Sequence, residues 1–182
     1  MKKITLTNST KVAPFTTAIM DAADAAKERL LELSETRNGI QLLEAMKFEK
    51  VGYDPLDTER ELNLVEQMNQ SFTYLASFRA AEILFQRHEG LSELSLNLGT
   101  RAGSDIESLE AEGIAAEVFA ATRPTSNGKL KKDIAKVAAT DATHKYVFFI
   151  CPGIEAGPYE GGATDGVLVW SLGIQNIPHP WH

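Results

Sequence analysis

The first third of the chain repeats apolar residues at helical spacing. These residues are Ile19, Ala22, Ala26, Leu30 and Leu33. Their recurrence every three or four positions predicts an amphipathic helix over 14–37, which Asn38 and Gly39 end. A shorter helix is expected over 40–47. The residues 52–55 then break the helical pattern, because proline disfavours helix at the residue before it.

A second long helix is expected to begin at Thr58. Thr58 and Glu61 have the spacing of a capping box, in which each side chain bonds the backbone of the other residue. Val65, Met68, Phe72 and Leu75 keep one face apolar. The pattern continues to about His88, and Gly90 ends it.

After Gly90 the apolar residues alternate with polar ones or form short continuous runs, as in strands. A helix with Leu130, Ile134 and Val137 on one side follows the loop 125–128. The expected strands are 94–98, 103–108, 113–121, 146–150 and 167–172. The fold class is therefore α/β, a mixed central sheet with flanking helices, and we divide the chain into an N-terminal helical arm, 1–57, and a core domain, 58–182.

Composition limits the class of protein. The chain has 182 residues, 43% hydrophobic and 24% charged, which is typical of a globular protein. No apolar run approaches the roughly 20 residues that cross a bilayer, so no membrane partner is expected. The single cysteine, Cys151, cannot form an internal disulfide, and we expect a cytoplasmic protein. A net charge of −7 argues against non-specific coating of nucleic acid, but it permits an enzyme that gathers cations with carboxylates.

Two acidic residues stand out within the predicted strands. Glu117 is flanked by small apolar residues in the segment AAEVFAA, and Asp105 lies on the preceding strand. A hairpin that pairs around Glu110 brings Asp105 and Glu117 within several ångströms of each other. Two facing carboxylates repel each other unless a positive group lies between them, and Mg²⁺ is a natural candidate. The alternative is that both carboxylates are solvated. The apolar neighbours of Glu117 favour a site, because an unpaired buried charge is costly.

These residues and the element order resemble the PD-(D/E)XK nuclease superfamily, whose fold is restriction-endonuclease-like. The resemblance is carried by Gly103-Ser104-Asp105-Ile106, a spacer of eleven residues, Ala116-Glu117-Val118-Phe119 and a following lysine-rich helix. It covers roughly 58–150 and implies an αβββαβ core. It also implies a Mg²⁺- or Mn²⁺-dependent endonuclease in which Asp105 and Glu117 bind the metal, with Glu66 as an additional acidic residue.

The sequence departs from the family at one catalytic position. The family's lysine stands two residues after the glutamate, where this chain has Phe119. Phenylalanine cannot orient water by hydrogen bonding, so the lysine function has moved or catalysis has been lost. Lys129, Lys132 and Lys136 form one stripe on the predicted helix, and migration to Lys129 or Lys132 is one interpretation.

Each of these interpretations has an ordinary rival. A lysine stripe opposite an apolar face is what a solvated surface helix shows, and Glu66 fits the wet face of its helix. Two functions therefore remain open. The first is metal-dependent cleavage of phosphodiester bonds in DNA or RNA. The second is an inactive interaction or regulatory protein on the same scaffold. The N-terminal helical arm is expected to form a homodimer.

Overall fold

The computed structural model describes residues 3–99, 103–108, 113–162, 164 and 166–173. The chain forms two compact units. Unit 1 contains Met1–Lys11 and Ala76–His182, and unit 2 contains Val12–Leu75. Unit 2 is therefore inserted between the first strand of unit 1 and the rest of that unit. The sequence-based division fell between residues 57 and 58, whereas this division falls at 11/12 and 75/76.

Within the described residues, unit 1 holds a seven-stranded sheet in the order β1-β4-β5-β6-β7-β9-β8. β6 pairs in parallel with β7, and β7 with β9, while the other pairs are antiparallel. The predicted mixed α/β class is confirmed. The strands are β1 (Lys3–Leu6), β4 (Leu94–Asn97), β5 (Ile106–Ser108), β6 (Ile114–Ala120), β7 (His144–Ile150), β8 (Gly157–Pro158) and β9 (Val167–Ser171).

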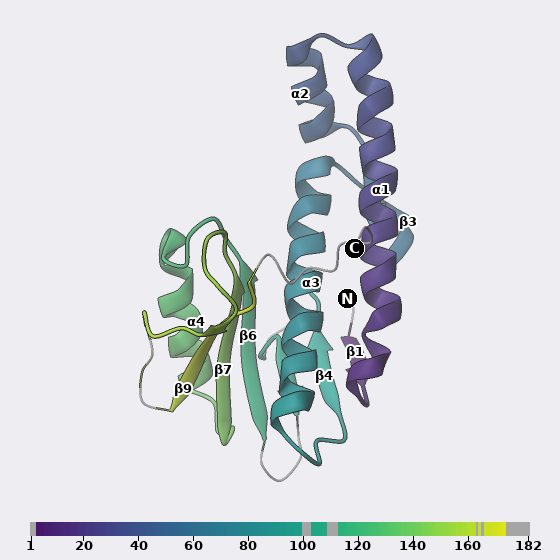
Figure 1. Cartoon of the computed structure of the whole chain (residues 1–182). Coiled ribbons are helices and arrows are strands. Elements are labelled where there is room, and N and C mark those ends of the chain that lie inside the picture. Colours follow the sequence, from purple (N-terminus) through teal and green to yellow (C-terminus); the bar gives the residue numbers. More distant parts are fainter. Residues whose placement is uncertain (1–2, 100–102, 109–112, 163, 165, 174–182) are drawn as a thin grey trace. The chain divides into compact units, whose positions relative to one another are not determined.

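The helix α4 (Lys129–Ala138) connects β6 to β7 and covers one face of the sheet (Figure 1). Leu130, Ile134 and Val137 point from α4 into an apolar layer on that face, as predicted. The sheet contributes Ala115, Phe119, Val147, Phe149, Cys151, Val167 and Val169 to this layer. Alternation along β6 places Glu117 on the same face as Ala115 and Phe119.

The opposite face of the sheet contacts residues at the C-terminal end of α3 (Leu64–Arg87). His88 Nε2 and the hydroxyl of Tyr146 are 2.8 Å apart in a hydrogen bond. The guanidinium of Arg87 lies over the ring of Trp170, 4.9 Å from its centroid. The sheet of unit 1 therefore has a helix on each side, which buries both faces.

Unit 2 contains α1 (Ala13–Thr36), α2 (Gly39–Phe48) and the N-terminal half of α3. The helices predicted over 14–37 and 40–47 are confirmed. The predicted helix start at Thr58 is wrong, because β3 (Asp57–Leu62) occupies that segment and pairs with β2 (Gly52–Asp54). A capping box does begin α3, but Asn63 and Glu66 form it.

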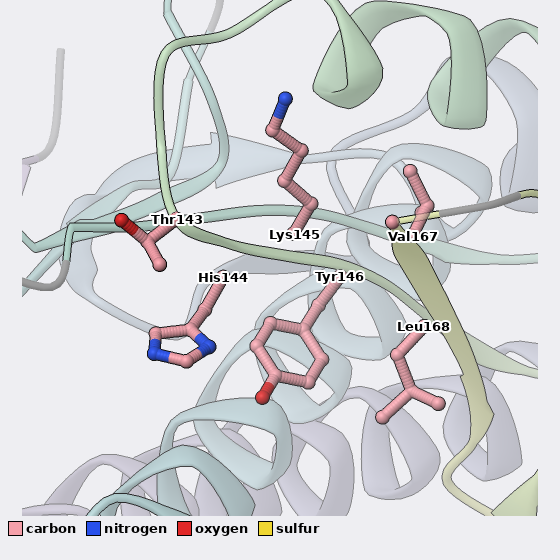
Figure 2. Close-up of a pocket in the computed structure, with 7 residues that line it drawn as sticks. Thr143, His144, Lys145, Tyr146, Val167 and Leu168 are labelled. Carbon is pink, nitrogen blue, oxygen red and sulfur yellow. The ribbon is translucent and has the colours of Figure 1, made fainter.

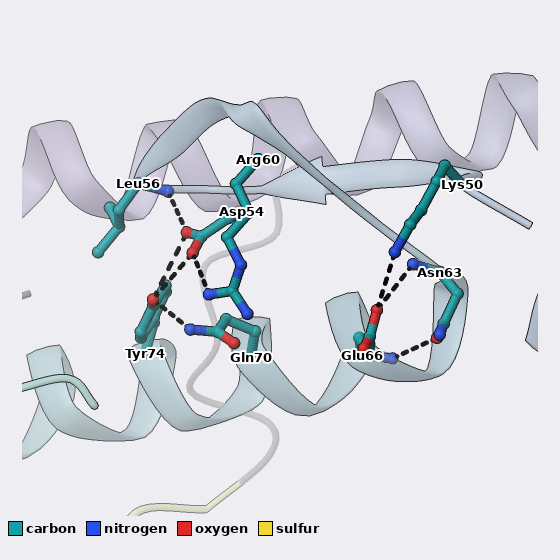
Figure 3. A network of polar contacts seen from close by, with 8 residues as sticks. All are labelled: Lys50, Asp54, Leu56, Arg60, Asn63, Glu66, Gln70 and Tyr74. Carbon is teal, nitrogen blue, oxygen red and sulfur yellow. Dashed lines mark hydrogen bonds and ion pairs between the residues drawn. The ribbon is translucent and has the colours of Figure 1, made fainter. Parts of the chain in front are cut away.

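A buried carboxylate, Asp54, joins the β2–β3 hairpin to α3 (Figure 3). Its oxygens accept hydrogen bonds from the backbone N–H of Leu56 at 2.9 Å and from Arg60 at 3.3 Å. The hydroxyl of Tyr74 lies 3.4 Å from Asp54 Oδ2 and also accepts a hydrogen bond from Gln70. Burial raises the pKa of Tyr74 to about 12. At neutral pH this hydroxyl therefore stays protonated and can donate to Asp54.

Across the described part of the chain, no helix combines the length and the apolar character that crossing a bilayer requires.

Candidate functional site

The β5–β6 hairpin sets the position of the two predicted metal-binding carboxylates. Ile106 pairs with Ala116, and Glu107 pairs with Ala115. Continuing this register by one residue places Asp105 opposite Glu117, as the sequence predicted. The turn predicted around Glu110 lies outside the described residues.

Glu117 is buried in the middle of the sheet, where its side chain is 2% exposed. Burial raises the pKa of its carboxyl group, and the negative charge of Asp105 raises it further. Lys136 acts in the opposite direction. Its Nζ lies 2.8 Å from Oε1 and 2.8 Å from Oε2 of Glu117 and donates a hydrogen bond to Oε2. Although Oε1 is close to the ammonium, it has no hydrogen-bond partner.

Asp105 is held directly against β6. Its Oδ2 accepts a hydrogen bond from the backbone N–H of Val118 at 2.8 Å. Burial raises the pKa of the Asp105 carboxyl group, and this hydrogen bond and the charges of Lys136 and Lys129 partly oppose that effect. The aspartate therefore lies close enough to both lysines for their charges to act on it.

Sequence reasoning missed a third buried carboxylate, Asp133. It lies on α4 and its Oδ1 accepts a hydrogen bond from Lys129 Nζ at 2.7 Å, while Oδ2 has no hydrogen-bond partner. Burial is the largest cause that raises the pKa of Asp133, and the charge of Asp105 adds to it. A signal was available, because position 133 shares the apolar spacing of Leu130, Ile134 and Val137.

We call Asp105, Glu117 and Asp133 the carboxylate cluster. Two lysines, Lys129 and Lys136, compensate three carboxylates, so the cluster retains one uncompensated negative charge when all three carboxylates are ionised. Oxygen-only donors suit Mg²⁺ or Mn²⁺, and Oδ2 of Asp133, which has no hydrogen-bond partner, leaves acceptor capacity for a cation or a hydrogen-bond donor. Within the part of the chain that the structure describes, however, no three His, Cys, Asp or Glu side chains converge closely enough to hold a metal ion. The donor chemistry fits a divalent cation, whereas its use needs a rearrangement of these side chains.

The other predicted site residues are placed as follows. Lys129 binds Asp133 rather than Glu117, and Lys132 is exposed on α4. Glu66 belongs to unit 2, where it caps α3 and lies 3.6 Å from Lys50 (Figure 3). The lysine that contacts Glu117 is Lys136, which sequence analysis placed on the stripe without selecting it.

Phe119 stands two residues after Glu117, where the resemblance to PD-(D/E)XK nucleases leads one to expect a lysine. Its ring packs in the apolar layer under α4 and stacks on Phe149, with 5.7 Å between the ring centroids. A lysine ammonium at this position would lose its hydration within an apolar layer. The packing therefore explains why the positive charge near Glu117 comes from α4.

A separate open pocket, with a volume of about 310 Å³, lies where β7 and β9 begin (Figure 2). Figure 2 shows the Lys145 side chain on one side of the strand and the His144 and Tyr146 side chains on the other. The His144 ring lies 4.5 Å from the ring of His88. The pocket is lined by Thr143, His144, Lys145, Tyr146, Gly166, Val167 and Leu168.

No family model, curated protein or solved structure matches this chain. Functional assignment therefore depends on the side chains of the site.

Proposed function

We propose that the chain is a nuclease-like protein that hydrolyses phosphodiester bonds in nucleic acid with a divalent cation. The observation that carries the proposal is a buried glutamate, Glu117, that meets a lysine and lies opposite an aspartate on the neighbouring strand. The order of α3, β4, β5, β6, α4 and β7 supports it, because this is the αβββαβ order that the resemblance implies.

The residues have distinct proposed roles. Asp105 and Glu117 would hold Mg²⁺ or Mn²⁺, and Asp133 would add negative charge beside them. A bound cation of this kind polarises a phosphoryl oxygen and lowers the pKa of water. Lys136 takes the place of the lysine that Phe119 replaces, because its ammonium already lies 2.8 Å from Glu117. It is half-exposed, so its ammonium can also reach a phosphate in solvent.

Cation binding and cleavage test this function together. Calorimetric titration with Mg²⁺ and Mn²⁺ is expected to show uptake by the wild type and at least about tenfold weaker uptake by Asp105→Asn and Glu117→Gln, because each loses a charged ligand. Labelled single- and double-stranded DNA and RNA should be cleaved by the wild type only with the cation. Lys136→Met should lose cleavage, and the matched variant Lys132→Met should keep it. Equal cation uptake by the wild type and Asp105→Asn would contradict the proposal.

Two observations favour a second candidate, an inactive interaction or regulatory protein. Lysines already contact Glu117 and Asp133, and the described carboxylates do not converge on one metal position. On this hypothesis the lysines are permanent counter-ions and the cluster is structural. It predicts that wild-type protein takes up no Mg²⁺ or Mn²⁺ and cleaves none of the four substrates.

A further inference from the structure

The side of α4 that faces away from the sheet is basic. Its exposed positions hold lysines and alanines, whereas the acidic residue of this helix, Asp133, is buried. The exposed lysines are Lys129, Lys131, Lys132 and Lys136, and Ala135 and Ala138 occupy the other exposed positions. We call the four exposed lysines the α4 lysine face.

This face differs from an ordinary solvated helix surface of the same chain. α1 exposes charges of both signs, and its Arg29 pairs with Glu32 at 2.8 Å. The segment 121–145 has six basic and two acidic residues, whereas the remaining chain has 12 basic and 23 acidic residues. Exposed acidic residues occur nearby, at Asp141 after the helix and at Glu160 on the loop before β9, but not on the face itself. Because solubility alone is served by either sign, the exclusion of acids from this face indicates an anionic partner.

The α4 lysine face keeps hydrogen-bond donors for an external molecule. Lys131 and Lys132 form no ion pair within the part of the chain that the structure describes. Lys129 and Lys136 each contact a buried carboxylate, yet their side chains remain 46% and 48% exposed. An ammonium group carries three N–H donors. All four lysines can therefore donate to an acceptor outside the protein.

The α4 lysine face adjoins the candidate site. Lys129 and Lys136 belong to this face and also contact the carboxylate cluster. Between these two residues the helix rises about 10 Å. At its C-terminal end, Lys145 Nζ donates a hydrogen bond to the carbonyl of Ala138 at 2.9 Å and extends the positive charge. An anionic chain that follows this row therefore passes beside the carboxylate cluster.

The composition of the face indicates which anionic chain fits. A row of lysines matches a ligand whose negative charge repeats, and double-stranded DNA carries one charge per about 1.7 Å of its axis. The face has no arginine, asparagine or glutamine, whose planar groups bond base edges through paired hydrogen bonds. It also has no hydroxyl or amide side chain to bond the 2′-hydroxyl groups of RNA. Its contacts are therefore suited to phosphates, which carry no sequence information.

Two other occupants fit less well. Within the described residues of unit 1 no aromatic side chain is exposed, so the unpaired bases of a single strand find no surface on which to stack. A membrane-binding helix places large apolar residues next to its lysines, whereas the exposed apolar residues of α4 are alanines. Double-stranded DNA remains the best match.

We propose that the α4 lysine face binds the phosphates of double-stranded DNA without reading the base sequence. The inference rests on the proposed function for the choice of nucleic acid as the anion. It adds the binding surface, the duplex form and the lack of sequence preference. Lys132 contributes one phosphate contact, so Lys132→Met keeps cleavage when the substrate is saturating and raises KM.

Fluorescence anisotropy of a labelled DNA duplex, with EDTA present so that no divalent cation supports cleavage, tests the inference. Lys131→Gln with Lys132→Gln should bind at least about tenfold more weakly than the wild type. It should also reduce the slope of log affinity against log salt concentration by about 2. Lys27→Gln with Lys47→Gln removes the same charge from exposed positions of unit 2 and should bind like the wild type. Circular dichroism identifies any variant that fails to fold. A wild type that does not bind, a folded α4 variant that binds normally, or a control that loses as much overturns the inference.

A second set of variants leaves the lysines intact. Ala135 is exposed on the same side of α4, three and four positions after Lys132 and Lys131. Ala135→Lys should tighten DNA binding and Ala135→Glu should weaken it. Ala135→Gln has similar helix propensity and no charge, and should bind like the wild type. If the lysine and glutamate variants bind equally well, the DNA does not lie on this face.

Competition with unlabelled ligands identifies the partner. DNA duplexes of unrelated sequence should compete equally, within about threefold. Single-stranded DNA, duplex RNA and vesicles that contain phosphatidylserine should all compete more weakly. A strong preference for one duplex sequence would contradict phosphate-only contacts. If any of the other ligands competes at least as well as duplex DNA, the assigned partner is wrong.

Failure of this inference can be distinguished from failure of the proposed function. Binding is measured without a divalent cation, so it does not depend on cleavage. A protein that binds DNA through the α4 lysine face but cleaves no substrate would contradict the hydrolase alone. A protein that cleaves nucleic acid while Lys131→Gln with Lys132→Gln binds normally would contradict the DNA-binding face alone.

Discussion

The two units bury carboxylates in different ways. In unit 2, both oxygens of Asp54 receive hydrogen bonds, from Leu56, Arg60 and Tyr74. In unit 1, Glu117 and Asp133 each keep one oxygen without a hydrogen-bond partner. A saturated carboxylate fastens secondary-structure elements together, whereas an unsaturated one retains capacity for a proton, a cation or a ligand. The difference supports our proposal of chemistry in unit 1 and of a structural role for the Asp54 network.

The units also differ in their apolar surface. Unit 1 buries large apolar side chains under α4, whereas unit 2 leaves several on its surface within the described residues. Unit 1 is therefore expected to depend on its apolar core for stability, whereas the exposed apolar side chains of unit 2 are expected to contribute little to it.

The largest expected contrast comes from deleting one phenylalanine ring in each unit. Phe149 is fully buried between Phe119 and Tyr159, whereas Phe48 is 69% exposed. Phe149→Ala should lower the free energy of unfolding by about 3–5 kcal/mol, because it removes buried surface and leaves a cavity. Phe48→Ala should change it by less than about 0.5 kcal/mol. Urea unfolding followed by both tryptophan fluorescence and circular dichroism measures each variant against the wild type. Equal losses in the free energy of unfolding for the two variants would contradict the contrast in apolar surface.

Removing the Lys136 ammonium tests how much it stabilises the buried charge of Glu117. Lys136→Met should cost about 2 kcal/mol, below the usual range for breaking a buried ion pair because the lysine is half-exposed. Lys132→Met on the same helix should cost less than about 0.5 kcal/mol. Adding Glu117→Gln to Lys136→Met should recover most of the loss, since no buried charge then remains. Urea unfolding of the wild type, Lys136→Met, Glu117→Gln and the double variant gives the coupling energy, and additive costs would show that the two groups do not interact.

Removing a single hydroxyl should weaken the hydrogen-bond network around Asp54 in unit 2. Tyr74→Phe should lower the free energy of unfolding by about 1 kcal/mol, because Asp54 keeps its bonds to Leu56 and Arg60. Tyr53→Phe on β2 serves as the matched control. Alkaline absorbance titration gives a second readout, since one phenol should ionise near pH 12 in the wild type and be missing from the Tyr74 variant. A normal titration of all the tyrosines would refute the burial of this hydroxyl.

A smaller effect is expected from pH. Burial raises the pKa of Asp105, Glu117 and Asp133 in the folded protein, so folding favours their protonated forms. Stability should therefore rise as pH falls from neutrality through the raised pKa values, and this gain should end near the unfolded values of about 4. The raised pKa of Lys136 contributes across this window and is lost only above about pH 10.

The difference between wild type and variant isolates that pH effect from the other acidic residues. Urea midpoints at about pH 5.5 and pH 7.5 should show a larger gain on acidification for the wild type than for Glu117→Gln with Asp133→Asn. The same gain in both proteins would place the titrating groups elsewhere.

Much of unit 1 could be predicted from sequence because its elements carry strong patterns. The apolar run of β7 and the apolar face of α4 indicate burial directly. The hairpin register followed from the spacing of Asp105 and Glu117 and is confirmed by the pairing of Ile106 with Ala116. The partners of the carboxylates were harder to predict, because Lys136 and Lys132 look alike on a helix until the strand beneath them is placed.

The sequence was less informative about β2, β3 and β1. β3 reads DTEREL and exposes all but its last residue, so neither alternation nor an apolar run indicates a strand. Thr58 and Glu61 instead imitated a helix cap, whereas the true cap, Asn63 with Glu66, has the same spacing five residues later. β1 is a short strand at the edge of the sheet, and its pairing with β4 depends on residues about ninety positions away.

That pairing has a consequence for the order in which the protein forms. A ribosome makes β1 first, then all of unit 2, and only then β4, the neighbour on which β1 depends. During this interval unit 2 can fold while the backbone N–H and C=O groups of β1 still have no partner strand. When β1 finally pairs with β4, the segment between them is already folded. The loss of chain entropy on pairing is therefore smaller than for an unfolded loop of the same length.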